Sequence, residues 1–221
     1  DVLVEVCKQV VGIREFKIID GIMCINGKRI VFHGVNRHEF SPKTGRVISY
    51  EETKKDLQIM KANNINALRT SHYPNNTFVY DLCDELGLYC IDETNLETHG
   101  TWSESFDTSI YLPDDKEDKW LDSVLDRANS MYERDKNHPS IVIWSLGNES
   151  RGGSILQKEA DFLRAKDNTR VIHYEGISHD RRYPNSSDIE SQMYTFAVDC
   201  EKFILEHPEK PFILCEYAHS M

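Results

Sequence analysis

Short apolar runs alternate with stretches of helical periodicity along most of this 221-residue chain. From residue 30 onward, seven short runs read as strands, and each has a polar cluster on its C-terminal side. These runs cover residues 30–32, 65–69, 88–92, 141–144, 171–174, 189–193 and 211–215. The run Ile141–Trp144 carries no polar residue, which is typical of a strand buried on both faces of a sheet.

Helical spacing fills most of the intervals between these runs. We expect helices at about 50–62, 77–86, 119–135, 154–166 and 198–206. Repeated strand-then-helix units predict an α/β fold with a parallel sheet. Seven successive units favour a TIM (β/α)₈ barrel over an open, doubly wound sheet. On this count the eighth strand lies beyond Met221, so we expect an incomplete barrel.

The first 30 residues have a different pattern. Asp20-Gly21 and Asn26-Gly27 predict two tight turns that connect short strands, the first of them between 16–19 and 22–25. Residues 1–13 alternate in the manner of a strand. We interpret 1–13 as the tail of a preceding immunoglobulin-like β-sandwich domain, and 14–221 as the barrel, truncated before its last strand.

Composition narrows the class of protein. A formal net charge of -11 disfavours binding to nucleic acid and to anionic membrane surfaces. No apolar run approaches the roughly 20 residues that span a bilayer, and no signal peptide is visible at the first residue. The six cysteines form no CxxC pair, so we interpret them as reduced core residues of a cytoplasmic protein rather than as disulfides or zinc ligands.

Two carboxylates stand out because they follow two different predicted strands. Glu149 comes after Ile141–Trp144, and Glu216 comes directly after 211–215. Hydrolysis of a glycosidic bond needs one carboxyl group to protonate the leaving oxygen and another to attack or to activate water. Acidic residues are nevertheless common in βα loops, and Glu149 could instead cap the following helix. Position alone leaves these alternatives open.

Six motifs, taken together and in order, resemble the central barrel of the large bacterial-type β-galactosidases of glycoside hydrolase family 2. The resemblance runs from about Gly12 to Met221. The motifs are Asn36–Glu39, Arg69–Pro74, Asp92–Gly100, Asn137–Ser140, Gly147–Ser150 and Cys215–His219.

The resemblance implies retaining hydrolysis of terminal β-galactosides such as lactose, with Glu149 as general acid/base and Glu216 as nucleophile. It also implies an active-site Mg²⁺ held by Glu97, His99 and Glu149. Because a histidine is an unusual ligand for Mg²⁺, Mn²⁺ remains an alternative. Family members often bind Na⁺ as well, and we expect its ligands to lie outside this chain.

The remaining polar residues of these motifs are expected to bind the sugar. By the resemblance, Asn148 contacts the 2-hydroxyl, and Tyr194 lies beside the nucleophile. Arg69 could pair with a carboxylate of the site, Glu216 among them, and Trp102 could form an aromatic platform. Three histidines match residues that contact galactose: His38, His72 and His219. We expect Trp144 and the other histidines to be structural, namely His33, His138, His173, His179 and His207.

Other activities compete with this one. β-Glucuronidases and β-mannosidases of the same family share the Asn-Glu pair, and a sugar-binding fragment without activity is a rival of another class. A zinc hydrolase is disfavoured because no HxH or HExxH arrangement is present. Because other parts of a family member complete the sugar site, we expect this fragment alone to be inactive, and its parent to be a homo-oligomer.

Overall fold

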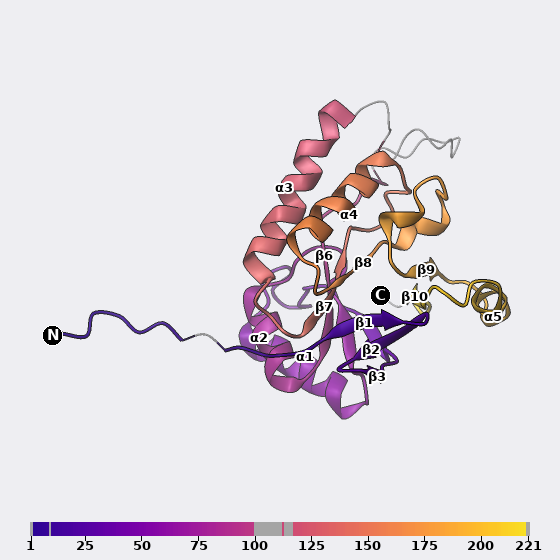
Figure 1. Cartoon of the computed structure of the whole chain (residues 1–221). Coiled ribbons are helices and arrows are strands. Elements are labelled where there is room, and N and C mark those ends of the chain that lie inside the picture. Colours follow the sequence, from indigo (N-terminus) through magenta and orange to yellow (C-terminus); the bar gives the residue numbers. More distant parts are fainter. Residues whose placement is uncertain (1, 9, 100–111, 113–116, 220–221) are drawn as a thin grey trace.

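Seven parallel strands form an incomplete barrel in the computed structural model, which describes residues 2–8, 10–99, 112 and 117–219. Five strands pair in the order β4-β5-β6-β7-β8, and β10 pairs with β9. Figure 1 labels β6 to β10 of this set. Their bounds are β4 Gly34–Asn36, β5 Ala67–Arg69, β6 Tyr89–Glu93, β7 Ile141–Ser145, β8 Val171–His173, β9 Glu190–Met193 and β10 Phe212–Glu216. The predicted α/β class and the predicted strand count are confirmed.

The barrel wall is interrupted at two places. Within the described residues no ladder joins β8 to β9, and this seam is bridged by one backbone hydrogen bond, from the Asp188 N–H to the Ile172 carbonyl (2.9 Å), and by bonds to side chains. The Ile172 N–H donates to the Asp188 carboxylate (2.7 Å), and the Tyr174 N–H donates to the Ser187 hydroxyl (3.0 Å). A second interruption lies between β10 and β4, which no ladder in the described chain joins. There the Asn36 side-chain amide donates to the Cys215 carbonyl (3.0 Å). The expected incomplete barrel is therefore present.

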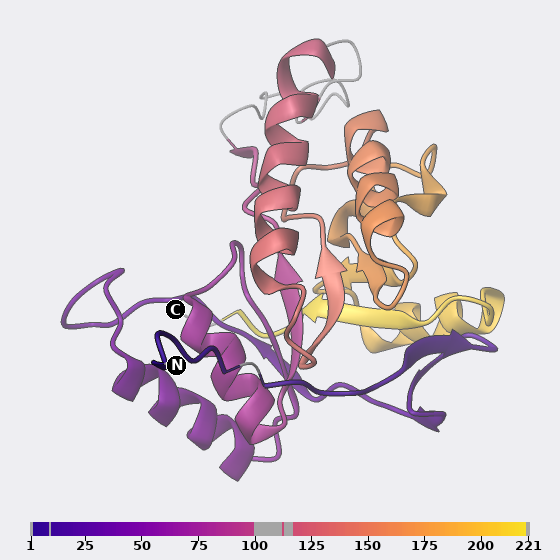
Figure 2. The ribbon, with the colours of Figure 1, turned by 60° about the vertical axis from the view of Figure 1, so that its left-hand side comes forward.

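The helices follow the strands as predicted, and both views show α1 beside α2 and α3 beside α4 (Figure 2). Their bounds are α1 Tyr50–Ala62, α2 Thr77–Leu86, α3 Glu117–Asp135, α4 Ser154–Lys166 and α5 Ala197–Glu206, with short 3₁₀ turns at Glu175–Ser178 and Pro184–Ser186. Ser49 and Glu52 form a capping box that starts α1. Gly87 ends α2 with φ +67°, which glycine adopts without steric cost.

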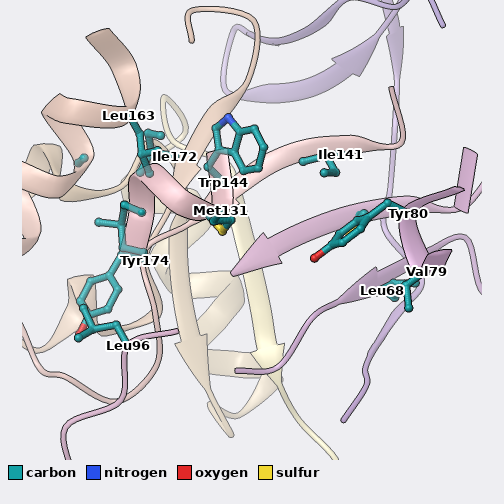
Figure 3. Packing of buried hydrophobic residues seen from close by; sticks show 14 of the residues in the cluster. Leu68, Val79, Tyr80, Leu96, Met131, Ile141, Trp144, Leu163, Ile172 and Tyr174 are labelled. Atoms are coloured by element: carbon teal, nitrogen blue, oxygen red, sulfur yellow. The ribbon is translucent and has the colours of Figure 1, made fainter. Parts of the chain in front are cut away.

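The main hydrophobic core lies between the strands and the helices outside them (Figure 3). All five residues of β7 are buried, which confirms a strand covered on both faces. Trp144 belongs to this core, and its indole N–H donates to the Asp167 carboxylate (2.9 Å). The structural interpretation of Trp144 is confirmed. All six cysteines are free, and five of them are buried.

A three-stranded antiparallel sheet precedes the barrel: β1 Phe16–Ile19, β2 Ile22–Ile25 and β3 Lys28–Arg29. The residues of both predicted turns have positive φ, with Asp20 at 51° and Asn26 at 50°. Phe16 and Met23 of this sheet pack against Val142 in a second core cluster. The two predicted hairpin turns are confirmed.

The prediction that the first barrel strand covers 30–32 is wrong, because that strand begins at Gly34. The Ile30 N–H donates to the Met23 carbonyl (2.9 Å), so Ile30 continues the N-terminal sheet. The Asn66 side chain then bonds the Val31 carbonyl and the His33 N–H, in place of a ladder. Apolar residues in 30–32 pack against the second core cluster, which gave the run its strand-like pattern.

Residues 2–8 and 10–15 form no strand, contrary to the expected strand in this segment. Their apolar side chains are exposed, since no neighbouring strand in the described chain covers them (Figure 1). Arg14 anchors the segment by donating to the carbonyls of Ile141 (2.6 Å) and Pro139 (3.2 Å). The assignment of 1–13 to a preceding domain stays a prediction. Among helices of the described residues, none has the length and apolar character that crossing a membrane requires.

Candidate active site

Arg69, the last residue of β5, connects several of the predicted site residues. Its side chain is 3% exposed. Nη1 lies 3.3 Å from Oε1 of Glu216, Nη2 donates to Oδ1 of Asn148 (3.0 Å), and Nε donates to Oε2 of Glu93 (2.6 Å). Burial alone would lower the pKa of Arg69, but the Glu93 carboxylate outweighs this effect and raises it. The guanidinium is therefore a permanent cation at the carboxyl ends of the strands.

Glu216 ends β10 and accepts a hydrogen bond from the Tyr194 hydroxyl at 2.6 Å. The Tyr194 hydroxyl also lies 3.4 Å from Nδ1 of His219. Its hydrogen bond to the Glu216 carboxylate raises the pKa of Tyr194 to about 12. Tyr194 therefore stays a neutral donor to this carboxylate at physiological pH.

Two histidines lie on another side of Glu216. Nδ1 of His72 is 2.8 Å from Oε1 of Glu93, while Nε2 lies 3.8 Å from Oε1 of Glu216. The His38 ring packs edge-on against His72 with a centroid distance of 5.5 Å. Burial and the neighbouring His72 lower the pKa of His38. His38 is therefore suited to act as a neutral donor or acceptor toward a hydroxyl group.

Glu97, His99 and Glu149 form a group that fits a metal ion, with candidate ligand atoms within 4.8 Å of one another. Nε2 of His99 lies 2.6 Å from Oε2 of Glu149, and Nδ1 lies 3.6 Å from Oε1 of Glu97. The Asn148 amide donates to Glu97 (2.9 Å) and so links this group to Arg69. Two carboxylates and an imidazole suit a divalent cation.

The backbone around Glu149 has an unusual conformation. Gly147 has φ +142° and lies against Leu96, where an added Cβ would be 2.6 Å from the Leu96 carbonyl oxygen. Glu149 has φ +41°, and its N–H donates to Oε1 of Glu175 (2.5 Å). Helix α4 is capped at Gly153. The alternative in which Glu149 caps this helix is therefore wrong.

Sequence reasoning missed several buried polar residues beside these groups. Glu93 is fully buried and accepts hydrogen bonds from Arg69, His72 and the Ser145 hydroxyl (2.7 Å). Glu175 is also buried, and burial together with nearby carboxylates raises its pKa to about 8. A signal for Glu93 was available, since it lies inside a quoted motif at a strand end.

The remaining predictions concern Trp102 and the histidines that were expected to be structural. Trp102 lies outside the described residues. His138, expected to be structural, bonds the Asp84 carboxylate at 2.7 Å. His173 is fully buried between Ser145 and Ser191, which agrees with a satisfied core histidine. The structure thus brings together every predicted site residue that it describes.

Comparison with known proteins identifies the family. Residues 16–221 match the family described as "Glycosyl hydrolases family 2, TIM barrel domain". The chain belongs to glycosyl hydrolase family 2. A family 2 relative, the β-galactosidase of Priestia megaterium, is 56% identical over 218 residues, covering 98% of this chain and 21% of the relative. The chain thus spans about one-fifth of that protein's length.

Two further similarities bear on the family 2 barrel. The β-galactosidase large subunit of Latilactobacillus sakei is 45% identical over 221 residues, covering 99% of this chain and 35% of the relative. The structure of a β-glucuronidase from Ruminococcus gnavus in complex with D-glucuronic acid superposes with a TM-score of 0.77 at 24% identity, covering 94% of this chain and 38% of that one. At this identity, the superposition supports the barrel fold alone.

Proposed function

We propose that the intact protein containing this chain is a retaining β-galactosidase, which hydrolyses terminal β-D-galactose from small β-galactosides. The observation that carries the proposal is the position of Arg69, which holds Glu216 with one nitrogen and Asn148 with another. Because Asn148 precedes Glu149, this arrangement brings the two candidate carboxylates to one site. The 56% identity to a protein named β-galactosidase supports this substrate class.

In the proposed mechanism Glu216 attacks the anomeric carbon while Glu149 protonates the departing sugar oxygen. The galactosyl-enzyme then reacts with water, from which Glu149 removes a proton, and the product keeps its β configuration. Such chemistry requires the two carboxyl groups to stand about 5–5.5 Å apart. Arg69 and Tyr194 hold the Glu216 carboxylate in place for its attack.

The sugar is proposed to lie above Asn148, His38, His72 and His219, with Asn148 assigned to the 2-hydroxyl. Hydrogen bonds to that hydroxyl strengthen in the transition state and lower the barrier. Trp102 is proposed as an aromatic platform for the leaving group.

Mg²⁺ is proposed as the ion held by Glu97, His99 and Glu149, with Mn²⁺ as an alternative. When bound, the cation supplies positive charge beside the acid/base carboxylate. Glu97 and His99 keep Glu149 oriented toward the leaving oxygen. We place the Na⁺ ligands of the intact protein outside this chain.

A galactoside is favoured over a glucuronide because the likeness to the β-glucuronidase rests on 24% identity and carries only the fold. Since one relative is named a large subunit, we propose an assembly of several subunits, which a homo-oligomer would satisfy. We place the protein in the cytoplasm, in accord with its free cysteines.

The test compares turnover of nitrophenyl β-galactoside, β-glucuronide and β-mannoside by the intact protein. We expect preference for the galactoside, and losses of at least ~10³-fold in Glu149→Gln and Glu216→Gln. Azide should restore turnover in the Glu149 variant, because this anion attacks the galactosyl-enzyme without needing a base, releasing Glu216 and a β-galactosyl azide. Preference for another sugar, or unchanged turnover in both variants, would contradict the proposal. We expect the 221-residue chain alone to be far less active than the intact protein.

A further inference from the structure

One buried carboxylate, Glu93, stands behind the nucleophile without touching the space that the sugar would occupy. It is the last residue of β6, and its side chain is fully buried. Oε2 accepts from Nε of Arg69 (2.6 Å) and from the Ser145 hydroxyl (2.7 Å), and Oε1 lies 2.8 Å from Nδ1 of His72. Two of these donors, Arg69 and His72, also face Oε1 of Glu216.

The directions of these hydrogen bonds follow from the charge on Glu93. Although burial opposes ionisation, Arg69 and the other donors lower the pKa of Glu93 to about 2, so its carboxylate only accepts. Nδ1 of His72 must therefore carry a proton. Ser145 gives its one proton to Glu93, so its oxygen must accept from Nδ1 of His173 (2.8 Å).

The hydrogen bonds continue through His173 on β8 to Ser191 on β9. Burial lowers the pKa of His173 to about 3, so this ring is neutral and its Nε2 accepts from the Ser191 hydroxyl (2.8 Å). A hydrogen-bond chain therefore runs from Ser191 through His173 and Ser145 to Glu93, with every donor pointing toward the carboxylate. It crosses β9, β8, β7 and β6, including the seam where no ladder joins β8 to β9.

We propose that Glu93 is a positioning residue that balances the charge of Arg69 throughout the reaction, an inference that rests on the proposed function. Because Glu93 pairs with Arg69, the Glu216 carboxylate stays available for attack. When Glu216 bonds to the anomeric carbon and the leaving oxygen takes the Glu149 proton, Glu216 becomes a neutral ester. Without Glu93, the buried Arg69 cation would then lose its ionised partner, and an unpaired buried cation is costly.

The test replaces Glu93 by Gln in the intact protein, which keeps the size of the side chain and removes its charge. We expect kcat for nitrophenyl β-galactoside to fall about 10²- to 10³-fold, the range seen when one preorganised polar contact is lost. KM should change less than about threefold, because Glu93 does not contact the sugar. Glu93→Asp, which keeps the charge, should recover at least about tenfold of the loss.

A matched control is Glu159→Gln. Glu159 is also fully buried, and burial raises its pKa well above the usual range, in contrast to Glu93, while no described hydrogen bond joins it to Arg69 or Glu216. We expect its kcat to stay within about twofold of wild type.

A second readout separates this role from a merely structural one. With a dinitrophenyl β-galactoside, methanol speeds turnover when breakdown of the galactosyl-enzyme limits the rate, because it replaces water as acceptor. Glu93→Gln should abolish this acceleration, since formation of the ester becomes limiting. Loss of stability alone would lower the active fraction and leave the methanol effect unchanged, which would overturn the proposal.

Other outcomes also decide it. A Glu93→Gln variant within threefold of the wild-type kcat, or a Glu93→Asp variant as slow as the Gln variant, would overturn the proposal while leaving the proposed function intact. If Glu93→Gln does not fold, Ser145→Ala removes one donor to Glu93 and should lower kcat about fivefold or more at unchanged KM. An unchanged kcat there would refute the role of Glu93. A wild-type protein without turnover would instead refute the proposed function.

Discussion

The guanidinium of Arg69 reaches the carboxylate of Glu216 across the open side of the barrel, with 3.3 Å between Nη1 and Oε1. Arg69 ends β5 and Glu216 ends β10, and in the described chain no ladder joins their sheets. Side chains rather than backbone therefore connect the two strand ends. This connection determines where the proposed nucleophile stands relative to Asn148 and Glu149.

Arg69→Lys should lower kcat for a nitrophenyl β-galactoside by about 10²-fold or more. An ammonium group cannot reproduce the planar fork that contacts Glu93, Asn148 and Glu216 together. Steady-state kinetics of the intact protein measure the effect. Arg181→Lys is the control, because Arg181 makes a forked pair with Glu190 but is half exposed. Equal losses of kcat in both variants would show that the three contacts of Arg69 are not specifically required for catalysis.

Tyr194→Phe should lower kcat about 10- to 10²-fold and leave thermal stability nearly unchanged. The substitution removes the 2.6 Å hydrogen bond to Glu216, while the 51% exposed ring leaves little core packing to lose. Kinetics and thermal unfolding of the same preparations test both parts. Tyr132→Phe is the control. It removes a hydroxyl group that donates to the Lys166 carbonyl rather than to Glu216, so it should retain full activity.

Much of the fold was predictable because its signals are local. Gly87 predicted the end of α2, and the Asp20-Gly21 turn predicted the first hairpin. The first barrel strand was misplaced because Ile30 and Phe32 are apolar for another reason, namely packing against the second core cluster. Apolar residues show that a segment is buried, but they do not show which neighbour its backbone bonds.

The site was predictable only where residues belong to a motif with a known role. Glu93 lies inside a quoted motif that assigns it no role, and Glu175 lies in none, so the importance of both depends on which side chains the strand ends bring together. Glu93 and Asp92 are adjacent in the sequence, yet Glu93 faces Arg69 while Asp92 accepts from the Tyr80 hydroxyl (2.6 Å). Alternation along the strand separates them, and no pattern in the sequence reveals which of the two faces the site.

Gly147→Ala should disturb both stability and the proposed metal site. The new Cβ would lie 2.6 Å from the Leu96 carbonyl oxygen, at a φ of +142° that side chains rarely adopt. We expect a loss of about 2–4 kcal/mol from strain and overpacking together. Thermal unfolding and Mg²⁺ titration measure the two effects. Gly45→Ala has a positive φ without any neighbour within 4 Å, so it should cost less and leave Mg²⁺ affinity unchanged.

Asp167→Asn should remove a stabilisation that depends on pH. Although burial opposes ionisation, hydrogen bonds from Thr169, Trp144 and Arg170 lower the pKa of Asp167 to about 2. A carboxyl with a lowered folded pKa stabilises the protein above its unfolded pKa of about 4, and this contribution disappears as the pH falls through 2.

The expected magnitude for Asp167 is roughly 2 kcal/mol at pH 7, from a shift of nearly two pKa units. The difference in unfolding temperature between wild type and Asp167→Asn should therefore be large at pH 7 and shrink toward pH 3. A difference that stays constant with pH would mean that Asp167 contributes through packing rather than through its charge.

Removing the metal should separate binding of the ion from the chemistry of the carboxylates. We expect a chelator to lower kcat of the intact protein and Mg²⁺ or Mn²⁺ to restore it, since an ion held by Glu97, His99 and Glu149 would fix the position of the Glu149 carboxylate. Glu97→Gln should weaken Mg²⁺ binding about 10- to 10²-fold in calorimetric titration, because a neutral amide replaces a charged ligand. Glu133→Gln is the control, because it alters an exposed carboxylate on α3 that bonds Lys166. This variant should bind Mg²⁺ as tightly as the wild type. Equal affinities in all three proteins would place the ion elsewhere, and the link from Glu97 through Asn148 to Arg69 would then be purely structural.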